Sequence, residues 1–354
     1  MIRYIKREIF RGFKKHETRV HPLNYLFWEC TSRCNLNCLH CGSDCTKDSS
    51  YDDMPLADFL SALDTIPHTS ERITVVLTGG EPLLRSDIEQ CGMEIRKRGM
   101  HWSMVSNGYL YDEQKHIALL NAGMGALTFS LDGLEENHNW LRNAKNSFSK
   151  ADRAIDLAVK SPRLNFDVVT CVNQRNLTEL PAIYDYLIQK GVKAWRLFTI
   201  VPIGRARHNP DLFLADQQLK EVMDFIKTRR KLSLIDVKFS CEGFVGTYEN
   251  QVRNGFFFCR AGINIGSILI DGSISACPNI DRSFAQGDIY HDNFFDTWQS
   301  KFKPFRDRGW TKTGQCKKCS DYNDCLGNGM HYWHGEKENV LVCHNEKIKC
   351  ASKN

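Results

Sequence analysis

Short runs of apolar, β-branched and aromatic residues alternate with longer segments of helical periodicity through the first two thirds of the chain. The short runs predict six strands, at Tyr25–Glu29, Ile73–Thr78, His101–Val105, Ala126–Leu131, Phe166–Cys171 and Trp195–Ile200. Gly99, Gly123 and Gly191 each stand where an intervening helix would end. Six strands that are each followed by a helix predict a parallel α/β sheet. Because a closed barrel needs eight strands, we expect an open, partial (β/α)6 TIM-like barrel.

The pattern changes near residue 240. From there to the C-terminus glycine, aromatic and cysteine residues become denser, and loops replace helical periodicity. A loop-rich segment with few long apolar elements requires cross-links, which metal clusters can supply. We therefore expect a barrel over residues 21–240 and a loop-rich iron–sulfur domain over residues 241–354.

Residues 1–20 predict a separate basic amphipathic helix. Ile2, Ile5, Ile9 and Phe13 recur at helical spacing, and this segment holds seven Lys/Arg and two Asp/Glu. That excess equals the formal charge of +5 of the whole chain. A helix of this kind suits either an anionic membrane or an acidic peptide. We favour the simpler interpretation, in which its apolar face packs across the bottom of the barrel.

Composition and charge exclude several classes of protein. The 354 residues are 42% hydrophobic and 25% charged, which is typical of a globular chain. Outside residues 1–20 the charges balance, so no basic footprint for nucleic acid is spread over the fold. There is no secretory signal and no apolar run of roughly 18 residues that could span a membrane. We expect a cytoplasmic protein with reduced thiols.

Fifteen cysteines are present, and most of them are clustered. Cys34, Cys38 and Cys41 form a CxxxCxxC motif directly after the first predicted strand. Three thiolates on one tight loop can hold three irons of a [4Fe–4S] cluster and leave the fourth iron open to another ligand. A zinc site fits less well, because zinc takes four ligands that usually come in CxxC pairs. Cys30 and Cys45 flank the motif and complicate the ligand count.

This loop resembles that of the radical S-adenosylmethionine (SAM) enzymes, in which SAM chelates the open iron. The resemblance extends to Gly79-Gly80-Glu81-Pro82, which looks like the motif that binds the SAM amino group. It implies further SAM contacts at the ends of the next strands, although Asn-Gly and Asp-Gly are also common turns. The implied cofactor-binding residues are Gly79, Gly80, Glu81, Asn107, Ser130 and Asp132, with Arg205 as a weaker candidate for a carboxylate partner.

The C-terminal cysteines are similar to the SPASM extension of these enzymes, which carries auxiliary [4Fe–4S] clusters. The resemblance implies one complete cluster, or alternatively a structural zinc site, on Cys316, Cys319, Cys325 and Cys343. The family pattern continues with another cysteine four residues beyond the third, where this chain has Gly329. A second cluster on Cys259 and Cys277 would therefore lack ligands. Cys241, His331 or His334 could complete it, and we lean slightly toward its presence.

The resemblance implies a radical SAM/SPASM enzyme. An external one-electron reductant of the flavodoxin or ferredoxin type would reduce the first cluster, and SAM would yield a 5′-deoxyadenosyl radical that takes hydrogen from a substrate. Because SPASM enzymes commonly modify peptides, we expect a peptide or protein substrate. Pro278 stands where sulfatase-maturing enzymes typically have Asp, which counts against that activity. A small molecule or porphyrin remains an alternative substrate, and a non-catalytic iron–sulfur electron carrier remains an alternative function. No catalytic residue is assigned.

A narrower resemblance concerns the run from Cys325 to Trp333, which is similar to the subgroup associated with bacterial lipoprotein systems.

Overall fold

The computed structural model describes residues 2–49, 51–67, 73–240, 242–335 and 339–353. Its strands are β1 (Tyr25–Thr31), β2 (Thr74–Gly79), β3 (His101–Ser106), β4 (Ala126–Ser130), β5 (Asn165–Val172), β6 (Ala194–Thr199), β7 (Asp236–Phe239), β8 (Ile265–Ile268), β9 (Ser273–Ser275) and β10 (Gly287–Asp288). Its α-helices are α1 (Ile2–Val20), α2 (Leu56–Leu63), α3 (Ile88–Lys97), α4 (Glu113–Asn121), α5 (Glu135–Arg142), α6 (Ser147–Val159), α7 (Leu180–Lys190), α8 (Asp216–Leu232), α9 (Phe294–Ser300), α10 (Lys303–Arg306), α11 (Tyr322–Cys325) and α12 (His344–Ala351).

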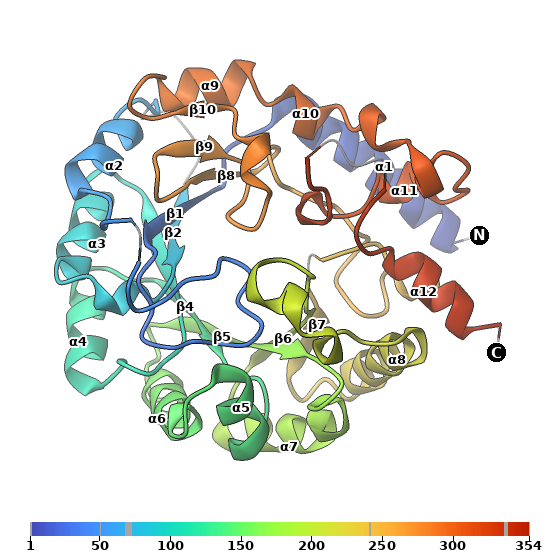
Figure 1. Cartoon of the computed structure of the whole chain (residues 1–354), viewed down its shortest axis with the longest axis horizontal. Coiled ribbons are helices and arrows are strands. Elements are labelled where there is room, and N and C mark those ends of the chain that lie inside the picture. The colour runs from blue at the N-terminus through green and yellow to red at the C-terminus, as the bar shows by residue number, and fades with distance from the viewer. Residues whose placement is uncertain (1, 50, 68–72, 241, 336–338, 354) are drawn as a thin grey trace.

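All ten strands belong to one sheet, in the order β10-β9-β8-β1-β2-β3-β4-β5-β6-β7. Strands β1 to β7 are parallel in sequence order, and helices cover their outer face (Figure 1). The sheet curves but ends at β7, so the barrel is open. This arrangement confirms the predicted partial (β/α) barrel.

The six predicted strands are present with ends that shift by one or two residues. Strand β7 was missed, because its four residues alternate charged and apolar side chains and carry too short a pattern. Strand β8 was missed because Gly266 interrupts its apolar run. It pairs parallel with β1 and extends the sheet on the side opposite β2. The predicted boundary at residues 240 and 241 thus falls between two strands of one sheet.

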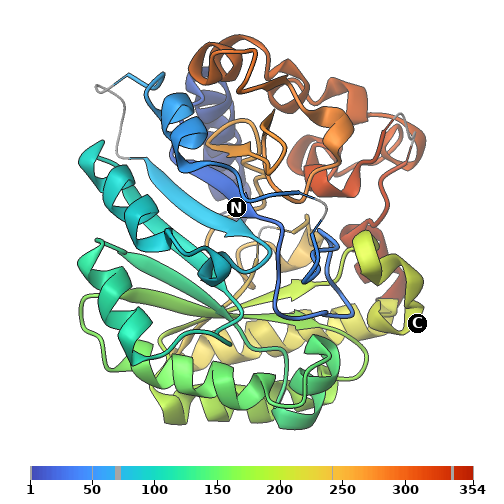
Figure 2. The same ribbon diagram turned by 60° about the vertical axis from the view of Figure 1, so that its left-hand side comes forward.

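Large aromatic side chains fill the space between the sheet and its helices. Trp28, Trp102 and Trp195 are fully buried on β1, β3 and β6. The Trp28 ring stacks on Phe59 of α2, with centroids 3.9 Å apart. This packing fixes the carboxyl ends of neighbouring strands at one edge, where the following loops meet. Figure 2 shows the loop after β1 at that edge, between the C-terminal segment and the loops and helices that follow β4 to β6.

Helix α1 packs with a face other than the predicted one. Phe10 contacts Phe256 and Phe258, with centroids 5.5 and 6.5 Å apart. Lys14 is buried and donates to the Asp324 carbonyl at 2.7 Å. The predicted packing face was wrong, because Ile5 and Ile9 point into solvent. Among the described residues, no helix has the length and apolar character that crossing a membrane requires.

Candidate active site

The three cysteines of the CxxxCxxC motif lie close together on the loop after β1. Burial raises the pKa of the Cys34 thiol to about 12, and Cys38 and Cys41 add to this shift; Cys41 also raises the pKa of Cys38. Cys45 also belongs to this group, because its thiol donates a hydrogen bond to Cys41 and holds the pKa of Cys41 down to about 6. The structure therefore brings together the predicted three thiols and a fourth beside them.

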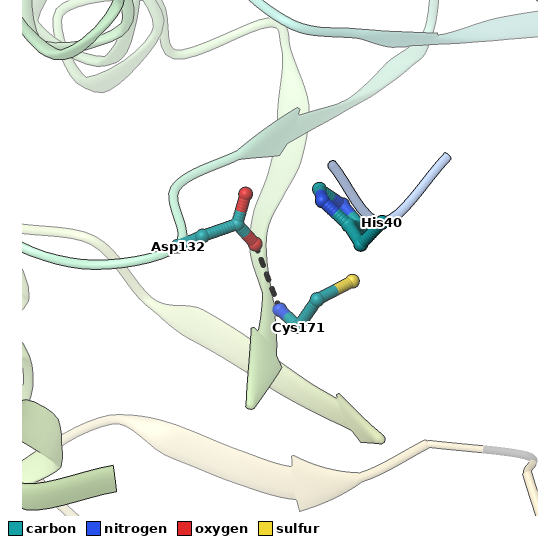
Figure 3. Close-up of side chains that lie close together, drawn as sticks. All are labelled: His40, Asp132 and Cys171. Carbon is teal, nitrogen blue, oxygen red and sulfur yellow. Dashed lines mark hydrogen bonds between the residues drawn. The ribbon is translucent and has the colours of Figure 1, made fainter. Parts of the chain in front are cut away.

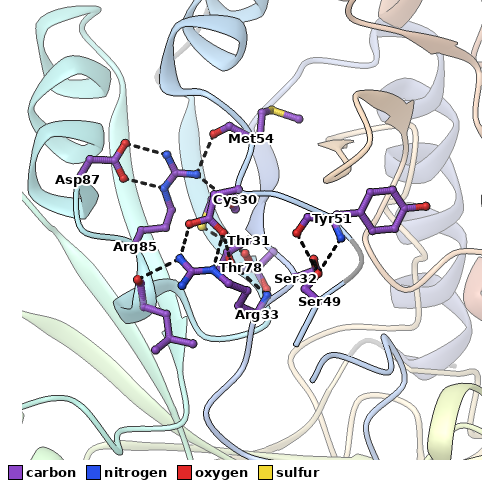
Figure 4. A network of polar contacts seen from close by, with 12 residues as sticks. Cys30, Thr31, Ser32, Arg33, Ser49, Tyr51, Met54, Thr78, Arg85 and Asp87 are labelled. Atoms are coloured by element: carbon purple, nitrogen blue, oxygen red, sulfur yellow. Dashed lines mark hydrogen bonds and ion pairs between the residues drawn. The ribbon is translucent and has the colours of Figure 1, made fainter. Parts of the chain in front are cut away.

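Cys30, the other flanking cysteine, has a structural position. It is fully buried on β1, and its thiol donates to the Thr78 carbonyl at 3.5 Å. Its own carbonyl accepts from the buried guanidinium of Arg85 at 2.7 Å, and Arg85 also pairs with Asp87 (Figure 4). Burial raises the pKa of the Cys30 thiol far above its usual range, so it stays protonated.

A second polar network holds the beginning of the cysteine loop. Arg33 pairs with Asp53, and the Thr31 hydroxyl donates to the same carboxylate at 2.5 Å (Figure 4). Arg33 also donates to the Leu84 carbonyl at 3.2 Å, which ties the loop to the segment after β2. These contacts fix the backbone immediately before Cys34.

Arg205 holds the far end of the cysteine loop. Its guanidinium donates to the carbonyls of Cys38 at 2.9 Å and Cys45 at 3.0 Å, and pairs with Asp44 at 2.8 Å. Gly204 precedes it with a φ of +53°, and a Cβ there would lie 2.4 Å from the Cys41 carbonyl oxygen. Arg205 therefore holds the loop, and its role as a carboxylate partner stays a prediction.

The two glycines after β2 permit a close backbone contact with the cysteine loop. A Cβ on Gly79 would lie 2.1 Å from the Thr31 carbonyl oxygen, and one on Gly80 would lie 2.0 Å from that of Arg33. Their amides continue the pairing of β1 and β2, with Gly80 donating to Thr31 at 2.8 Å. Only glycine fits at these positions.

Glu81 is fully buried directly after the two glycines. Its carboxylate accepts hydrogen bonds from the Ser106 hydroxyl and from the Asn107 amide, both at 2.8 Å. Burial raises its pKa to about 7, although these hydrogen bonds oppose the shift. Glu81 therefore joins the end of β2 to the end of β3.

Asn107 extends this connection to the cysteine loop. Its side-chain amide donates to the Asn35 oxygen at 2.9 Å and lies 4.0 Å from the Cys34 sulfur. Asn35 in turn has a buried side-chain nitrogen without a hydrogen-bond partner. A polar donor left unpaired beside a thiol is costly unless a bound group accepts from it.

A third group of polar residues lies after β4 (Figure 3). Asp132 is fully buried and pairs with Arg142 at 2.6 Å, and it accepts from the Cys171 amide at 2.8 Å. Burial alone would raise the pKa of Asp132, but Arg142, two neighbouring histidines and the Cys171 amide together lower it. The Asp132 carboxylate is thus engaged within the protein. Ser130 is buried at the end of β4, two residues before it.

Arg142 and His40 belong to this site, but sequence reasoning missed them. The Arg142 guanidinium lies 3.7 Å from the Cys38 sulfur, so it links Asp132 to a motif cysteine. His40 lies between Cys38 and Cys41 in the motif. Its Nδ1 is buried and unpaired, and burial lowers its pKa to about 4. Arg142 ends α5 without any motif around it, so only the fold reveals its position.

The donor set around the loop fits a [4Fe–4S] cluster. Three thiols on one loop suit iron–sulfur ligation rather than zinc, and Asp44, a carboxylate of the same loop, is paired with Arg205. The unpaired nitrogens of Asn35 and His40 add donors that a sulfur-rich or carboxylate-bearing group could accept.

Four C-terminal cysteines surround a second location. Cys316, Cys319, Cys325 and Cys343 line one cavity of about 230 Å³. The Asn328 amide donates to the Cys325 sulfur at 3.1 Å, and the first turn of α12 directs amides at Cys343. Four thiols around one small cavity form a complete ligand set for a cluster or for zinc.

Cys259 and Cys277 are each half-buried against the main core. Cys241, one of the residues that could complete their set, lies outside the described residues. His331 is half-buried and its Nε2 is unpaired, whereas His334 pairs with Asp281 at 2.7 Å. The second auxiliary cluster stays a prediction.

A polar cleft adjoins the cysteine loop. Two cavities of about 440 and 360 Å³ share Glu29, Asp44 and Arg282 among their lining residues. Glu29 is buried at the end of β1, and one of its oxygens accepts from Arg282 at 3.2 Å. Cys45 lines the larger cavity, so the cleft reaches the thiol group described above. Its position at the carboxyl ends of the strands is the usual place for substrate in such folds.

Two family models match this chain. Residues 28–187 match the radical SAM superfamily, and residues 259–320 match the iron–sulfur cluster-binding domain called SPASM. The first match contains the cysteine loop, Glu81, Ser130 and Asp132. The second contains Cys259, Cys277, Cys316 and Cys319.

Curated relatives divide between two activities. An AdoMet-dependent heme synthase of Oleidesulfovibrio alaskensis is 25% identical over 85% of this chain and 81% of its own length. The mycofactocin maturase MftC of Mycolicibacterium smegmatis is 24% identical over 86% of this chain and 77% of its own length.

Solved structures share the fold. The structure of anSMEcpe with bound AdoMet and Cp18Cys peptide superposes with a TM-score of 0.73 at 21% identity, over 94% of this chain and 96% of that one. Streptococcus suis SuiB bound to the precursor peptide SuiA gives 0.63 at 15% identity, over 93% and 76%.

Proposed function

Because this chain belongs to the radical SAM superfamily and carries a SPASM-type iron–sulfur domain, we propose that it is an enzyme that modifies a peptide or protein. Its cofactors are a [4Fe–4S] cluster, SAM, and one or two auxiliary clusters. The observation that carries the proposal is the position of three thiols at the carboxyl end of β1, next to a polar cleft.

Cys34, Cys38 and Cys41 would hold the cluster that binds SAM. When bound and reduced by an external flavodoxin or ferredoxin, these cofactors supply a 5′-deoxyadenosyl radical that removes hydrogen from the substrate. The chain supplies rigidity, since Arg33 and Arg205 fix the two ends of the loop. Loop motion would otherwise move the reacting groups out of reach.

Some of the other predicted cofactor-binding residues would contact SAM directly, and others would act through a neighbouring residue. Gly79 and Gly80 bring the chain after β2 against the loop, and Glu81 and Asn107 join the strand ends beside Cys34. Ser130 has a side chain that is not engaged in a described hydrogen bond and would contact SAM directly. Asp132 would act through Arg142 instead.

Arg142 would stabilise negative charge at the site. Its guanidinium lies 3.7 Å from the Cys38 sulfur and is held by the buried carboxylate of Asp132. A guanidinium near a buried thiolate lowers the free-energy cost of the thiolate's negative charge. The same group could receive a carboxylate of SAM, because it keeps further N–H donors.

Cys316, Cys319, Cys325 and Cys343 would hold an auxiliary [4Fe–4S] cluster. Their cavity is closed by four sulfurs, so this cluster would have no open iron for substrate. Cys259 and Cys277, together with Cys241 or a histidine, would form the second auxiliary site.

Two observations support a peptide or protein as substrate. The maturase MftC is 24% identical to this chain over 86% of the chain's length. The cleft also suits hydrogen-bond donors, because its lining includes the carboxylates of Glu29, Asp44, Asp48 and Asp281. Backbone amides and basic side chains of a peptide are donors of this kind.

A porphyrin substrate is the second candidate, and the heme synthase relatives favour it. Porphyrins of that class carry several carboxylates on a broad apolar ring. The larger cavity offers three carboxylates against one guanidinium, and Ile270 and Tyr51 are its main apolar groups. Like charges would oppose such a ligand.

The first test is anaerobic cleavage of SAM. Protein reconstituted with iron and sulfide is given SAM and dithionite, and 5′-deoxyadenosine is measured by mass spectrometry. We expect product from the native chain and none from the variant in which Cys34, Cys38 and Cys41 are all replaced by Ala. A cluster-loaded protein that neither binds SAM nor forms product would contradict the assignment.

The second test separates the two substrate classes. Peptide pools and iron coproporphyrin III are added separately to the reduced holoenzyme, and each added compound is followed by mass. A mass change in a peptide together with faster SAM cleavage supports the proposal. Conversion of the porphyrin alone would establish the second candidate instead.

A further inference from the structure

Helix α1 carries an apolar stripe that faces solvent. We define the α1 stripe as Ile5, Ile9 and Val20, whose residues are 50%, 68% and 49% exposed. They are four and eleven residues apart, so they share one face of the helix. A globular protein normally turns such a face toward its core.

The opposite face of α1 is fixed to the protein by contacts of its own. Arg11 pairs with Asp324 at 2.7 Å, and the buried Lys14 donates to the carbonyl of the same residue. Phe10 packs on Phe256 and Phe258. This face therefore accounts for the docking of α1, and the α1 stripe is not needed for it.

Basic residues border the α1 stripe on both sides. Lys6 lies along one edge, and Lys15 and Arg19 lie along the other, all exposed. The two acidic residues of the helix are engaged with the protein, since Glu8 pairs with Arg11 at 2.6 Å and Glu17 accepts from Asn264 at 2.9 Å. The outward surface of α1 is thus apolar in the middle and positively charged at its edges.

We propose that α1 docks this enzyme on the surface of an anionic lipid bilayer. An interfacial helix buries its apolar residues among the acyl chains while Lys and Arg meet the anionic headgroups. The α1 stripe and its borders have that distribution. The charge pattern favours anionic headgroups over a second copy of the chain, because two such helices would bring Lys6, Lys15 and Arg19 of both copies together.

The position of α1 is compatible with catalysis at a membrane. In Figure 1, α1 lies farther from the viewer, behind α10 and α11, whereas the loop after β1 lies nearer the viewer at the centre of the molecule. Docking through the α1 stripe would therefore leave the cleft beside the cysteine loop open to substrate. The inference does not depend on which substrate the enzyme modifies.

The experiment is sedimentation of the anaerobically prepared holoenzyme with sucrose-loaded vesicles. One set is pure phosphatidylcholine and the other contains about a third phosphatidylglycerol. We expect binding only to the anionic set. The variant with Ile5→Ser and Ile9→Ser should bind at least about tenfold more weakly, because it loses most of the buried apolar area. Replacing Lys6, Lys15 and Arg19 by Gln should weaken binding by about a hundredfold, and added salt should do the same.

Matched variants control for exposure and for charge. Leu234→Ser removes an apolar residue that is 62% exposed away from α1, and Gln at Lys145, Lys160 and Lys231 removes three exposed cations elsewhere. Both should bind as the native protein does. All of these side chains are exposed, so thermal unfolding of each variant should match that of the native chain.

Four results would overturn the proposal. The native protein could fail to bind anionic vesicles, or the double Ser variant could bind as well as the native protein. Light scattering could instead show a dimer that Ile9→Ser dissociates, which would make a second copy the occupant. Retention on an acidic polypeptide that depends on the cations but not on Ile5 and Ile9 would indicate a protein partner. SAM cleavage by the same samples tests the proposed function separately.

Discussion

The two cysteine sites of this molecule differ in how they are held. The N-terminal three thiols lie on a loop that depends on contacts from the ends of other strands, through Arg33, Glu81 and Arg205. The C-terminal four thiols lie between residues 316 and 343 and line one cavity of about 230 Å³, with the other lining residues also from the C-terminal segment. The first arrangement leaves room for a further ligand beside three sulfurs, and the second leaves none. The number of thiol ligands and the contacts that hold them therefore distinguish a site for chemistry from a site for structure or electron storage.

The largest effect should come from removing ligands at one site and not at the other. Replacing Cys34, Cys38 and Cys41 by Ala should abolish SAM cleavage completely, because Cys45, the thiol that remains beside them, cannot hold a four-iron cluster alone. Cys316→Ala should lower iron content by one cluster while SAM still binds. Iron analysis and SAM binding by equilibrium dialysis measure both results. Loss of SAM binding in Cys316→Ala would break the distinction.

Breaking the buried ion pair beside Cys38 should be the next largest effect. Asp132→Asn leaves the buried Arg142 charge without its partner, which costs about 3–5 kcal/mol of stability. Urea unfolding of the cluster-free protein measures this cost. Asp321→Asn breaks a partly exposed pair with Lys349 and should cost less than about 1 kcal/mol. Equal costs would show that Asp132 is not held as described.

Glu81 should give the cluster-free protein a distinct pH dependence. Burial raises its pKa in the folded chain to about 7, so folding favours the protonated carboxyl. That contribution is full below pH 4.5 and is lost as the pH rises to 7, by on the order of 3 kcal/mol. Glu81→Gln should therefore flatten the fall of stability over this range. Urea unfolding at several pH values measures it.

Glu242→Gln is the matched control, because burial raises the pKa of Glu242 to about 7 as well. It should flatten the fall of stability over the same pH range without changing SAM binding, since Glu242 accepts from Thr199 at the end of β6 and not from the groups beside Cys34. If Glu81→Gln left the pH dependence of stability unchanged, burial would not raise the pKa of Glu81 in solution.

The smallest effect should come from the loop clamp. Arg205→Gln removes the donors to the carbonyls of Cys38 and Cys45, which costs about 1–3 kcal/mol. The loss should fall on the N-terminal cluster, seen as faster release of iron to a chelator. Arg306→Gln, which removes donors to Gly262 and Trp298, should leave that rate unchanged.

The sequence alone located most of the parts. Six strands, the CxxxCxxC loop, the glycine pair after β2 and the four C-terminal cysteines were all visible, because period-two apolar runs and ligand spacings are local properties. Strands β7 and β8 were missed because they are short and depend on neighbouring strands for their stability. The membership of β8 in the barrel sheet could not be predicted, since it pairs with β1 more than 200 residues away.

The tertiary structure determined which face of each element is buried and which residues lie next to one another. The apolar side of α1 could be recognised from spacing, but only the contacts of Phe10, Arg11 and Lys14 show that it faces outward. Arg142 stands beside Cys38 without any motif, because α5 brings it there. Sequence determines local periodicity and the ligands available, whereas burial and long-range pairing depend on packing between segments that are distant along the chain.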